Sequence, residues 1–130
     1  MPGTLQFDLV SPERSLVSGQ ASSVLIPGAD GDMVAMPNHA PVVTGLRPGI
    51  VVAEAEGGVQ EYVVTGGFAQ ITMEGATILA DEALPKAEAR SEFLDEHIAA
   101  AKESQDGAAG AAADEAAKRV ADLETLKGML

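Results

Sequence analysis

The stretch MPNHAPVVTGLRPG, residues 36–49, decides how the rest of the chain is interpreted. It contains three prolines, two glycines, one histidine and one arginine. Proline fixes φ and has no backbone donor, so this stretch cannot be a helix. It is also too apolar for a flexible linker. We therefore interpret it as a rigid surface for another protein, with a catalytic role for His39 as the alternative.

Short apolar runs separated by turn residues lie on both sides of this stretch. Residues 4–10, TLQFDLV, alternate apolar and polar side chains as a half-buried strand does. Glycine-rich segments such as GADGD and TGG suit tight turns. Further strands are predicted for residues 22–27, 49–56, 59–65, 68–74 and 76–80. This spacing is typical of an antiparallel β-sandwich or flattened barrel.

A helical period begins at Pro85, which suits the first position of a helix. The segment QDGAAGA, residues 105–111, interrupts the period and predicts a loop between two antiparallel helices. The expected apolar faces are Phe93, Leu94, Ile98 and Ala101 on the first helix, and Ala113, Ala116, Val120, Leu123 and Leu130 on the second. The predicted domains are therefore a β domain at 1–84 and a helical hairpin at 85–130.

Composition excludes several classes of function. The 130 residues are 46% hydrophobic and carry a net charge of −12, which argues against binding to nucleic acid or anionic lipid. There is no cysteine, hence no disulfide or zinc–thiolate site. No apolar run is long enough to span a bilayer, and the N-terminus lacks the pattern of a signal peptide. We expect a soluble chain.

The sequence provides little material for catalysis or metal binding. No candidate nucleophile lies near His39, and His97 has no second metal ligand at helical spacing. GADGD begins like a calcium loop but lacks the later ligands and the closing glutamate. The glycine clusters do not match a nucleotide-binding loop. We expect no catalytic residue, no cofactor and no metal.

The order of the motifs resembles the epsilon subunit of the F-type ATP synthase. These motifs are LVSPERSLVSG, GADGDMVAMPNHAPVVTGLRPG, VTGG and ILADEA, followed by the helical hairpin. The resemblance covers essentially all 130 residues, and residues 28–49 are its most specific part. It implies a flattened antiparallel sandwich of about ten strands that carries a two-helix hairpin, a mainly β fold with an α appendage. It also implies a non-catalytic rotor subunit of the central stalk, between the gamma subunit and the c-ring.

The resemblance assigns contacts to particular residues. The residues matched to the gamma-facing surface are Ser11, His39, Ala40, Pro41, Val42 and Thr44. The turn matched to the c-ring contact comprises Asp30, Gly31, Asp32 and Met33. Transient contact with the catalytic head is a further expectation. The implied location is peripheral, at the cytoplasmic face of a bacterial inner membrane.

Two alternatives stay open. One is an ATP-sensing or inhibitory subunit. Members of the family that bind ATP carry an Ile/Leu-Asp-x-x-Arg-Ala pattern, but here Lys86 and Ala87 occupy its first two places before Arg90, so its acidic residue is absent. The other is a small-ligand β-sandwich, for which three Phe and one Tyr give little lining. From Pro85 onward there are ten acids against six bases, which predicts that the hairpin inhibits ATP hydrolysis only weakly.

Overall fold

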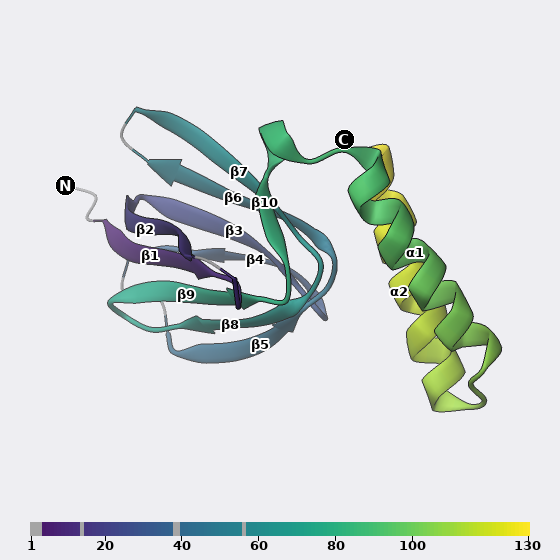
Figure 1. Ribbon diagram of the computed structural model, residues 1–130. Coiled ribbons are helices and arrows are strands. Elements are labelled where there is room, and N and C mark those ends of the chain that lie inside the picture. Colours follow the sequence, from purple (N-terminus) through teal and green to yellow (C-terminus); the bar gives the residue numbers. More distant parts are fainter. Residues whose placement is uncertain (1–3, 14, 38–39, 56) are drawn as a thin grey trace. The chain divides into compact units, whose positions relative to one another are not determined.

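The computed structural model describes residues 4–13, 15–37, 40–55 and 57–130 (Figure 1). The chain divides into two compact units, Met1–Lys86 and Ala87–Leu130. The strands of the first unit are β1 (Leu5–Val10), β2 (Ser15–Ala21), β3 (Ser23–Gly28), β4 (Gly31–Ala35), β5 (Val42–Leu46), β6 (Gly49–Ala55), β7 (Gly58–Val64), β8 (Gly67–Ile71), β9 (Gly75–Ala80) and β10 (Ala83–Pro85). A short 3-10 helix, Lys86–Glu88, follows them.

The described strands form one sheet in the order β10-β7-β6-β3-β5-β8-β9-β1-β2, with β4 paired to β3. Neighbouring strands are antiparallel except for β1 and β9, which are parallel. Strand β2 also contacts β6 and β10, so the sheet folds back on itself. The predicted β-sandwich of about ten strands followed by two helices is confirmed.

Alternation along the strands builds the core of the β unit. On β1, Leu5, Phe7 and Leu9 are buried, while the residues between them are half-exposed. The ring of Phe7 meets the ring of Tyr62 on β7 with centroids 6.5 Å apart and planes tilted by 55°. The other core positions are filled almost entirely by Val, Ile, Leu and Ala. A core with so few aromatic rings depends on close packing of aliphatic side chains.

One glycine of the TGG motif is required by its surroundings. Gly67 has φ of +128°, and a Cβ there would lie 2.1 Å from the carbonyl oxygen of Leu79. Any side chain would therefore clash with the backbone of β9 and also strain its own backbone. This close approach lets β8 pair with β9 from its first residue, Gly67, opposite Ala80.

Some sequence predictions differ from the structure. Strands β2, β4 and β10 were not predicted, and β5 lies inside the stretch interpreted as a rigid surface. Pro85 ends β10 instead of beginning a helix, because its neighbours pair with Val63 and Val64 on β7. A proline at the end of a short edge strand loses no ladder hydrogen bond. The first α-helix begins six residues later, at Ser91.

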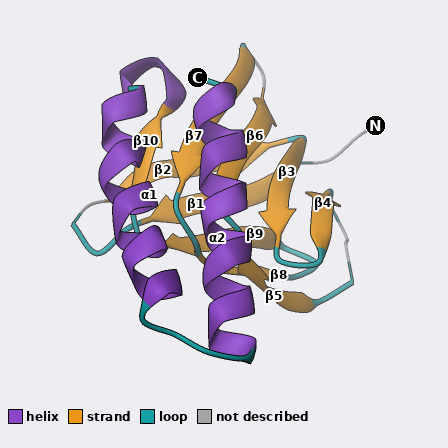
Figure 2. Ribbon diagram, turned by 90° about the vertical axis from the view of Figure 1, so that its right-hand side faces the viewer, coloured by secondary structure: helices purple, strands orange, loops and turns teal. Residues whose placement is uncertain are grey.

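The second unit is a helical hairpin of α1 (Ser91–Asp106) and α2 (Ala111–Gly128), as the glycine-rich break predicted (Figure 2). Its buried residues are Leu94, Ile98 and Ala101 on α1, and Leu123 and Leu126 on α2. The expected contribution of Leu130 was wrong, because the helix ends at Gly128 and Leu130 is 39% exposed. Leu126 takes its place, three residues after Leu123.

Ion pairs connect the two helices. The ammonium of Lys102 lies 3.4 Å from the carboxylate of Glu124, and that of Lys127 lies 2.5 Å from the carboxylate of Asp95. All four side chains are about half exposed. Within the described residues, no helix has both the length and the hydrophobicity needed to cross a membrane.

Candidate docking surface

Four neighbouring strands, β5, β8, β9 and β1, follow one another on one side of the β unit (Figure 1). Their side chains alternate between the core and the solvent. Ala69, Ile71 and Ile78 face the core, whereas Phe68 and Leu79 are 63% and 55% exposed. The outward residues of these strands therefore form a surface that does not take part in the packing of the core.

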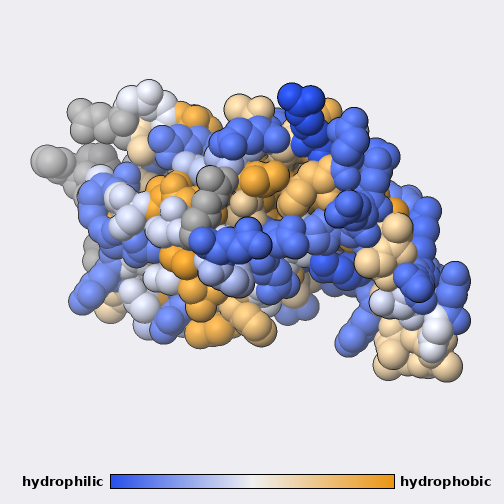
Figure 3. All heavy atoms as spheres, viewed as in Figure 1, coloured by the Kyte–Doolittle hydropathy of each residue, from blue (hydrophilic) through white to orange (hydrophobic). Residues whose placement is uncertain are grey.

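One end of this outer surface is apolar. The ladder places Val10 opposite Leu79, Leu79 opposite Phe68, and Phe68 opposite Gly45. Val43, the next outward residue of β5 before Gly45, is 67% exposed and lies opposite Gln70, so it borders this end on its polar side. We call Val10, Val43, Phe68 and Leu79 the apolar patch. Figure 3 shows hydrophobic residues gathered over the lower strands of this side.

An open hollow of about 330 Å³ borders the patch. Its lining residues are Val10, Ser11, Pro12, Phe68, Leu79, Ala80 and Asp81. Exposed apolar side chains beside a hollow are typical of protein interaction sites rather than of random surface. Ser11, predicted from the resemblance as a gamma contact, therefore lies against the apolar patch.

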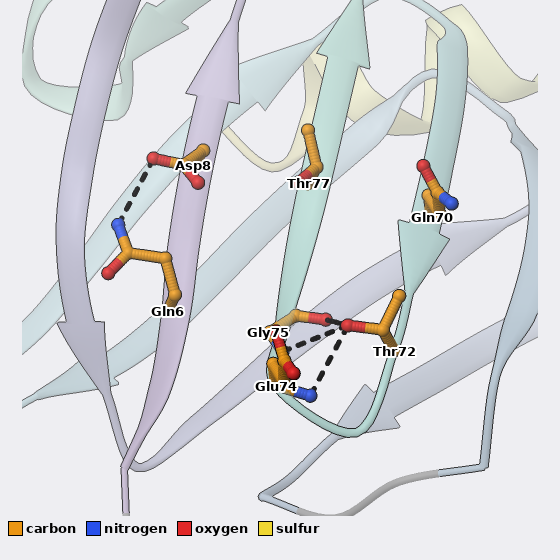
Figure 4. A pocket seen from close by; sticks show the side chains of 7 residues that line it. All are labelled: Gln6, Asp8, Gln70, Thr72, Glu74, Gly75 and Thr77. Carbon is orange, nitrogen blue, oxygen red and sulfur yellow. Dashed lines mark hydrogen bonds between the residues drawn. The ribbon is translucent and has the colours of Figure 1, made fainter.

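The other end of the same outer surface is polar. A hollow of about 220 Å³ is lined there by Gln6, Asp8, Gln70, Thr72, Glu74, Gly75 and Thr77 (Figure 4). The Gln6 amide donates to Asp8 at 3.2 Å and to Ser18 at 3.3 Å, and the Ser18 hydroxyl donates to Asp8 at 2.7 Å. These side chains are already hydrogen-bonded to one another, so this end offers little apolar area to a partner.

The structure separates the predicted gamma-contact residues. Ala40 and Pro41 are exposed just before β5, at the polar end, because Val42 pairs with Ile71. Ser11 lies at the opposite end, next to Val10. His39 falls outside the described residues.

The two predicted gamma contacts on β5 are less exposed than their neighbour. Val42 is half-buried and packs against the core, and Thr44 is opposite the buried Ala69 on the same side of the strand. Val43, between them, points outward.

Sequence reasoning missed the apolar patch. A signal was present, because the runs around Phe68 and Leu79 carry apolar residues at consecutive positions and so on both faces of a strand. A strand that strictly alternates apolar and polar residues is expected to have one face in contact with solvent. A strand with large apolar residues on both faces instead indicates that its outer face contacts another part of the chain or another protein.

The predicted c-ring turn joins β3 to β4. Gly28 pairs with Gly31, and Ala29 and Asp30 form the two-residue turn between them. Asp30 is exposed, while Met33 is half-buried and packs against the core. Asp32 forms an ion pair with Arg47, the residue that follows β5.

In the described part of the chain, the ionisable groups outside these surfaces make ordinary structural contacts. No group of His, Asp and Glu suited to a metal ion occurs among the described residues. The ring of His97 meets Phe93 edge-on on its own helix, with centroids 5.2 Å apart. Burial raises the pKa of the Tyr62 hydroxyl. The hydrogen bond from Lys127 to Asp95, together with the charge of that carboxylate, raises the pKa of the lysine.

Comparison with known proteins gives consistent results for the whole chain. Residues 4–86 match the family model for the ATP synthase delta/epsilon chain, beta-sandwich domain. The chain is 53% identical over 131 aligned residues to an ATP synthase epsilon chain from Ruegeria sp. (strain TM1040), covering 97% of this chain and 96% of that one.

Solved structures share the fold. A structure containing the F1 part and c-ring of the Euglena gracilis mitochondrial ATP synthase includes a chain that superposes with a TM-score of 0.74 at 24% identity. The alignment covers 99% of this chain and 82% of that chain. A chain in the central stalk and c-ring structure of the Tetrahymena thermophila mitochondrial ATP synthase gives a TM-score of 0.68 at 14% identity, covering 96% and 97% of the two chains.

Proposed function

The chain belongs to the family of ATP synthase epsilon chains, and from this premise we propose that it is a non-catalytic rotor subunit linking gamma to the c-ring. In this role it transmits torque during the coupling of proton flow to ATP synthesis. It would lie peripherally, at the cytoplasmic face of a bacterial inner membrane. The solved structures with the same fold come from assemblies that contain a c-ring, one of them described as a central stalk.

The single observation that carries the proposal is the apolar patch. Phe68, Leu79 and Val43 are each more than half exposed on one side of the sheet. Burying such groups against a partner removes apolar area from water, which stabilises a complex by roughly 25 cal/mol per Å² before the losses of association. We assign this patch, together with Ser11, to the contact with gamma.

The β3–β4 turn supports the second half of the proposal. The resemblance places this turn against the polar loops of the c-ring, where the family's ring presents a basic residue. Asp30, at the tip of the turn, is an exposed carboxylate. The patch and the turn occupy the same end of the β unit, because the backbone amide of Ala29 donates to the carbonyl oxygen of Gly45 at 2.8 Å.

The test is substitution of an outward residue of β5. Val43→Asp should weaken binding to the purified gamma subunit by at least about tenfold, because a charge without a partner would be buried in the interface. Val43 is preferable to Val42, which packs against the core, so that a charge at position 42 would also damage the fold. Binding is measured by titration calorimetry with the gamma subunit of the same synthase.

A matched control is available on another strand. Val59 on β7 is 59% exposed and lies outside the patch, so Val59→Asp should leave the affinity for gamma unchanged. Both variants are checked for native circular dichroism. Equal affinities of the two variants and the unmodified chain would overturn the assignment of the patch to gamma.

A further inference from the structure

Arg47 holds the β3–β4 turn from outside the hairpin. One guanidinium nitrogen, Nη1, donates to the carbonyl oxygen of Gly28 at 2.5 Å, and the other, Nη2, pairs with the carboxylate of Asp32. Gly28 is the last residue of β3, and Asp32 is the second residue of β4. The planar fork of arginine therefore bridges the two strands immediately next to their turn.

The backbone around Arg47 fixes this arrangement. The amide of Arg47 donates to the carbonyl oxygen of Pro27 at 3.0 Å, and Gly28 pairs with Leu46. The side chain of Arg47 is only 28% exposed, whereas that of Asp32 is 56% exposed. Because Arg47 is the more buried partner and is anchored at its own backbone, it positions the more exposed Asp32.

The two aspartates of the turn consequently differ in role. The charge of Asp32 is balanced within the chain by Arg47. Asp30 is exposed and has no hydrogen bond or ion pair with any part of the chain that the structure describes. A basic group that approaches this turn meets an unbalanced carboxylate only at position 30.

We infer that Arg47 is the positioning residue of this turn, which it holds by binding Asp32 and Gly28, and that Asp30 is the carboxylate offered to a basic partner. The inference rests on the proposed function for the identity of that partner, the c-ring. It separates Asp30 from Asp32, which the resemblance placed together in the turn matched to the c-ring contact. It also gives Arg47, which the resemblance left without a role, a defined task.

The first arm of the test measures the turn alone, without the ring. Hydrogen exchange of the Ala29 amide is followed in Arg47→Gln, Asp32→Asn and the double variant. Arg47→Gln should speed this exchange by about fivefold, and Asp32→Asn by about twofold. The double variant should match Arg47→Gln, because both changes remove the same interaction. Arg47→Lys should restore protection only in part, since an ammonium cannot bridge both acceptors.

Two controls accompany this arm. The Ser22 amide, which donates to the carbonyl oxygen of Glu54 at 2.7 Å, should keep its exchange rate in every variant. Lys86→Gln breaks a different exposed pair of the β unit, with Glu61, and should not affect Ala29. Two results would overturn the role of Arg47. One is an exchange rate in the double variant that equals the product of the two single effects, and the other is an unchanged rate in Arg47→Gln.

The second arm measures binding of the chain in complex with gamma to purified c-ring at increasing salt. Asp30→Asn should weaken binding by about two- to fivefold at low salt and remove most of its salt dependence. The Asp32→Asn, Arg47→Gln double variant has an unchanged net charge and should keep the salt dependence. If the double variant lost the salt dependence and Asp30→Asn kept it, the role of Asp30 would be overturned. If the unmodified chain does not bind the ring, the proposed ring contact and the role of Asp30 both fail, while the exchange arm still decides the role of Arg47.

Discussion

The β unit and the helical hairpin are stabilised by different means. The β unit buries side chains from every strand of its sheet, including Phe7, Leu9 and Ile26. The hairpin buries only a few, chiefly Leu94, Leu123 and Leu126, and adds two exposed ion pairs. Exposed ion pairs contribute little, and short helices are marginal in water. The comparison indicates that the β unit has the larger buried core and that the hairpin depends on fewer buried side chains.

A second contrast lies within the β unit itself. The inward residues of β8 and β9 are buried in the core, and the outward residues Phe68 and Leu79 contribute nothing to it. The inward face of these strands therefore carries stability, and the outward face is the one that we propose for docking. These contrasts are tested by comparing substitutions on the two faces of a strand, and substitutions in the two units.

The largest loss of stability is expected from a substitution on the inward face of β9. Ile78 is fully buried, whereas Leu79, its neighbour, is 55% exposed. Ile78→Ala should lower the free energy of unfolding of the β unit by about 2–5 kcal/mol, and Leu79→Ala by no more than about 0.5 kcal/mol. Urea unfolding is followed by tyrosine emission, because Tyr62 is the chain's one tyrosine and there is no tryptophan. Similar losses for both variants would contradict the separation of faces.

The next effect is expected in the hairpin. Leu126 is fully buried and Leu130 is 39% exposed. Leu126→Ala should therefore lower the stability of the hairpin by about 2 kcal/mol or more, while Leu130→Ala should have almost no effect. The measurement is the loss of the helical circular dichroism signal on heating. A larger effect of Leu130→Ala would show that the end of the chain contributes packing after all.

A smaller effect is expected from the ion pair between Lys127 and Asp95. The hydrogen bond to Asp95 raises the pKa of Lys127 above its ordinary value of 10.5. Protonated Lys127 is thus favoured in the folded hairpin, and this stabilisation is complete below pH 10.5 and is lost as the pH rises through the raised pKa. Asp95→Asn should lower the melting temperature of the hairpin slightly at neutral pH, and the difference should disappear at strongly alkaline pH.

The control for this pair is the adjacent acid. Glu96 is exposed and makes no ion pair with the described residues, so Glu96→Gln should leave the melting temperature unchanged. About 1 M salt, where the screening length is about 3 Å, should also reduce the effect of Asp95→Asn. An effect of Asp95→Asn that persists at alkaline pH would assign it to helix propensity rather than to the ion pair.

The smallest effect is expected from removing the second helix. Deletion of residues 111–130 should leave ATP hydrolysis by the assembled synthase nearly unchanged. The hairpin is acidic, with ten acids against six bases from Pro85 onward, and so it is poorly suited to the acidic surfaces of a catalytic head. Hydrolysis is measured on synthase reassembled with the full and the shortened chain. A several-fold rise would show that the hairpin inhibits and that its charge was misinterpreted.

Much of the architecture was predictable because local signals decided it. Alternation in β1 identified Leu5, Phe7 and Leu9 as core residues, and all three are buried. The glycines between residues 107 and 110 separated α1 from α2. Pro85 was assigned to the wrong element, since a proline suits both the start of a helix and the end of an edge strand. Only the pairing with β7 distinguishes these two possibilities.

The sequence by itself determined most of the strands, the helical hairpin and the family. Only the tertiary structure decided which apolar side chains stay outside and which charges are balanced. Phe68 and Leu79 are as apolar as their buried neighbours, so composition could not place them on the outer face. Arg47 and Asp32 are 15 residues apart and meet because β3 pairs with both β4 and β5. The pairing of distant strands sets such contacts. A strand's own pattern says which of its faces is buried, but it does not say which other strand lies beside it.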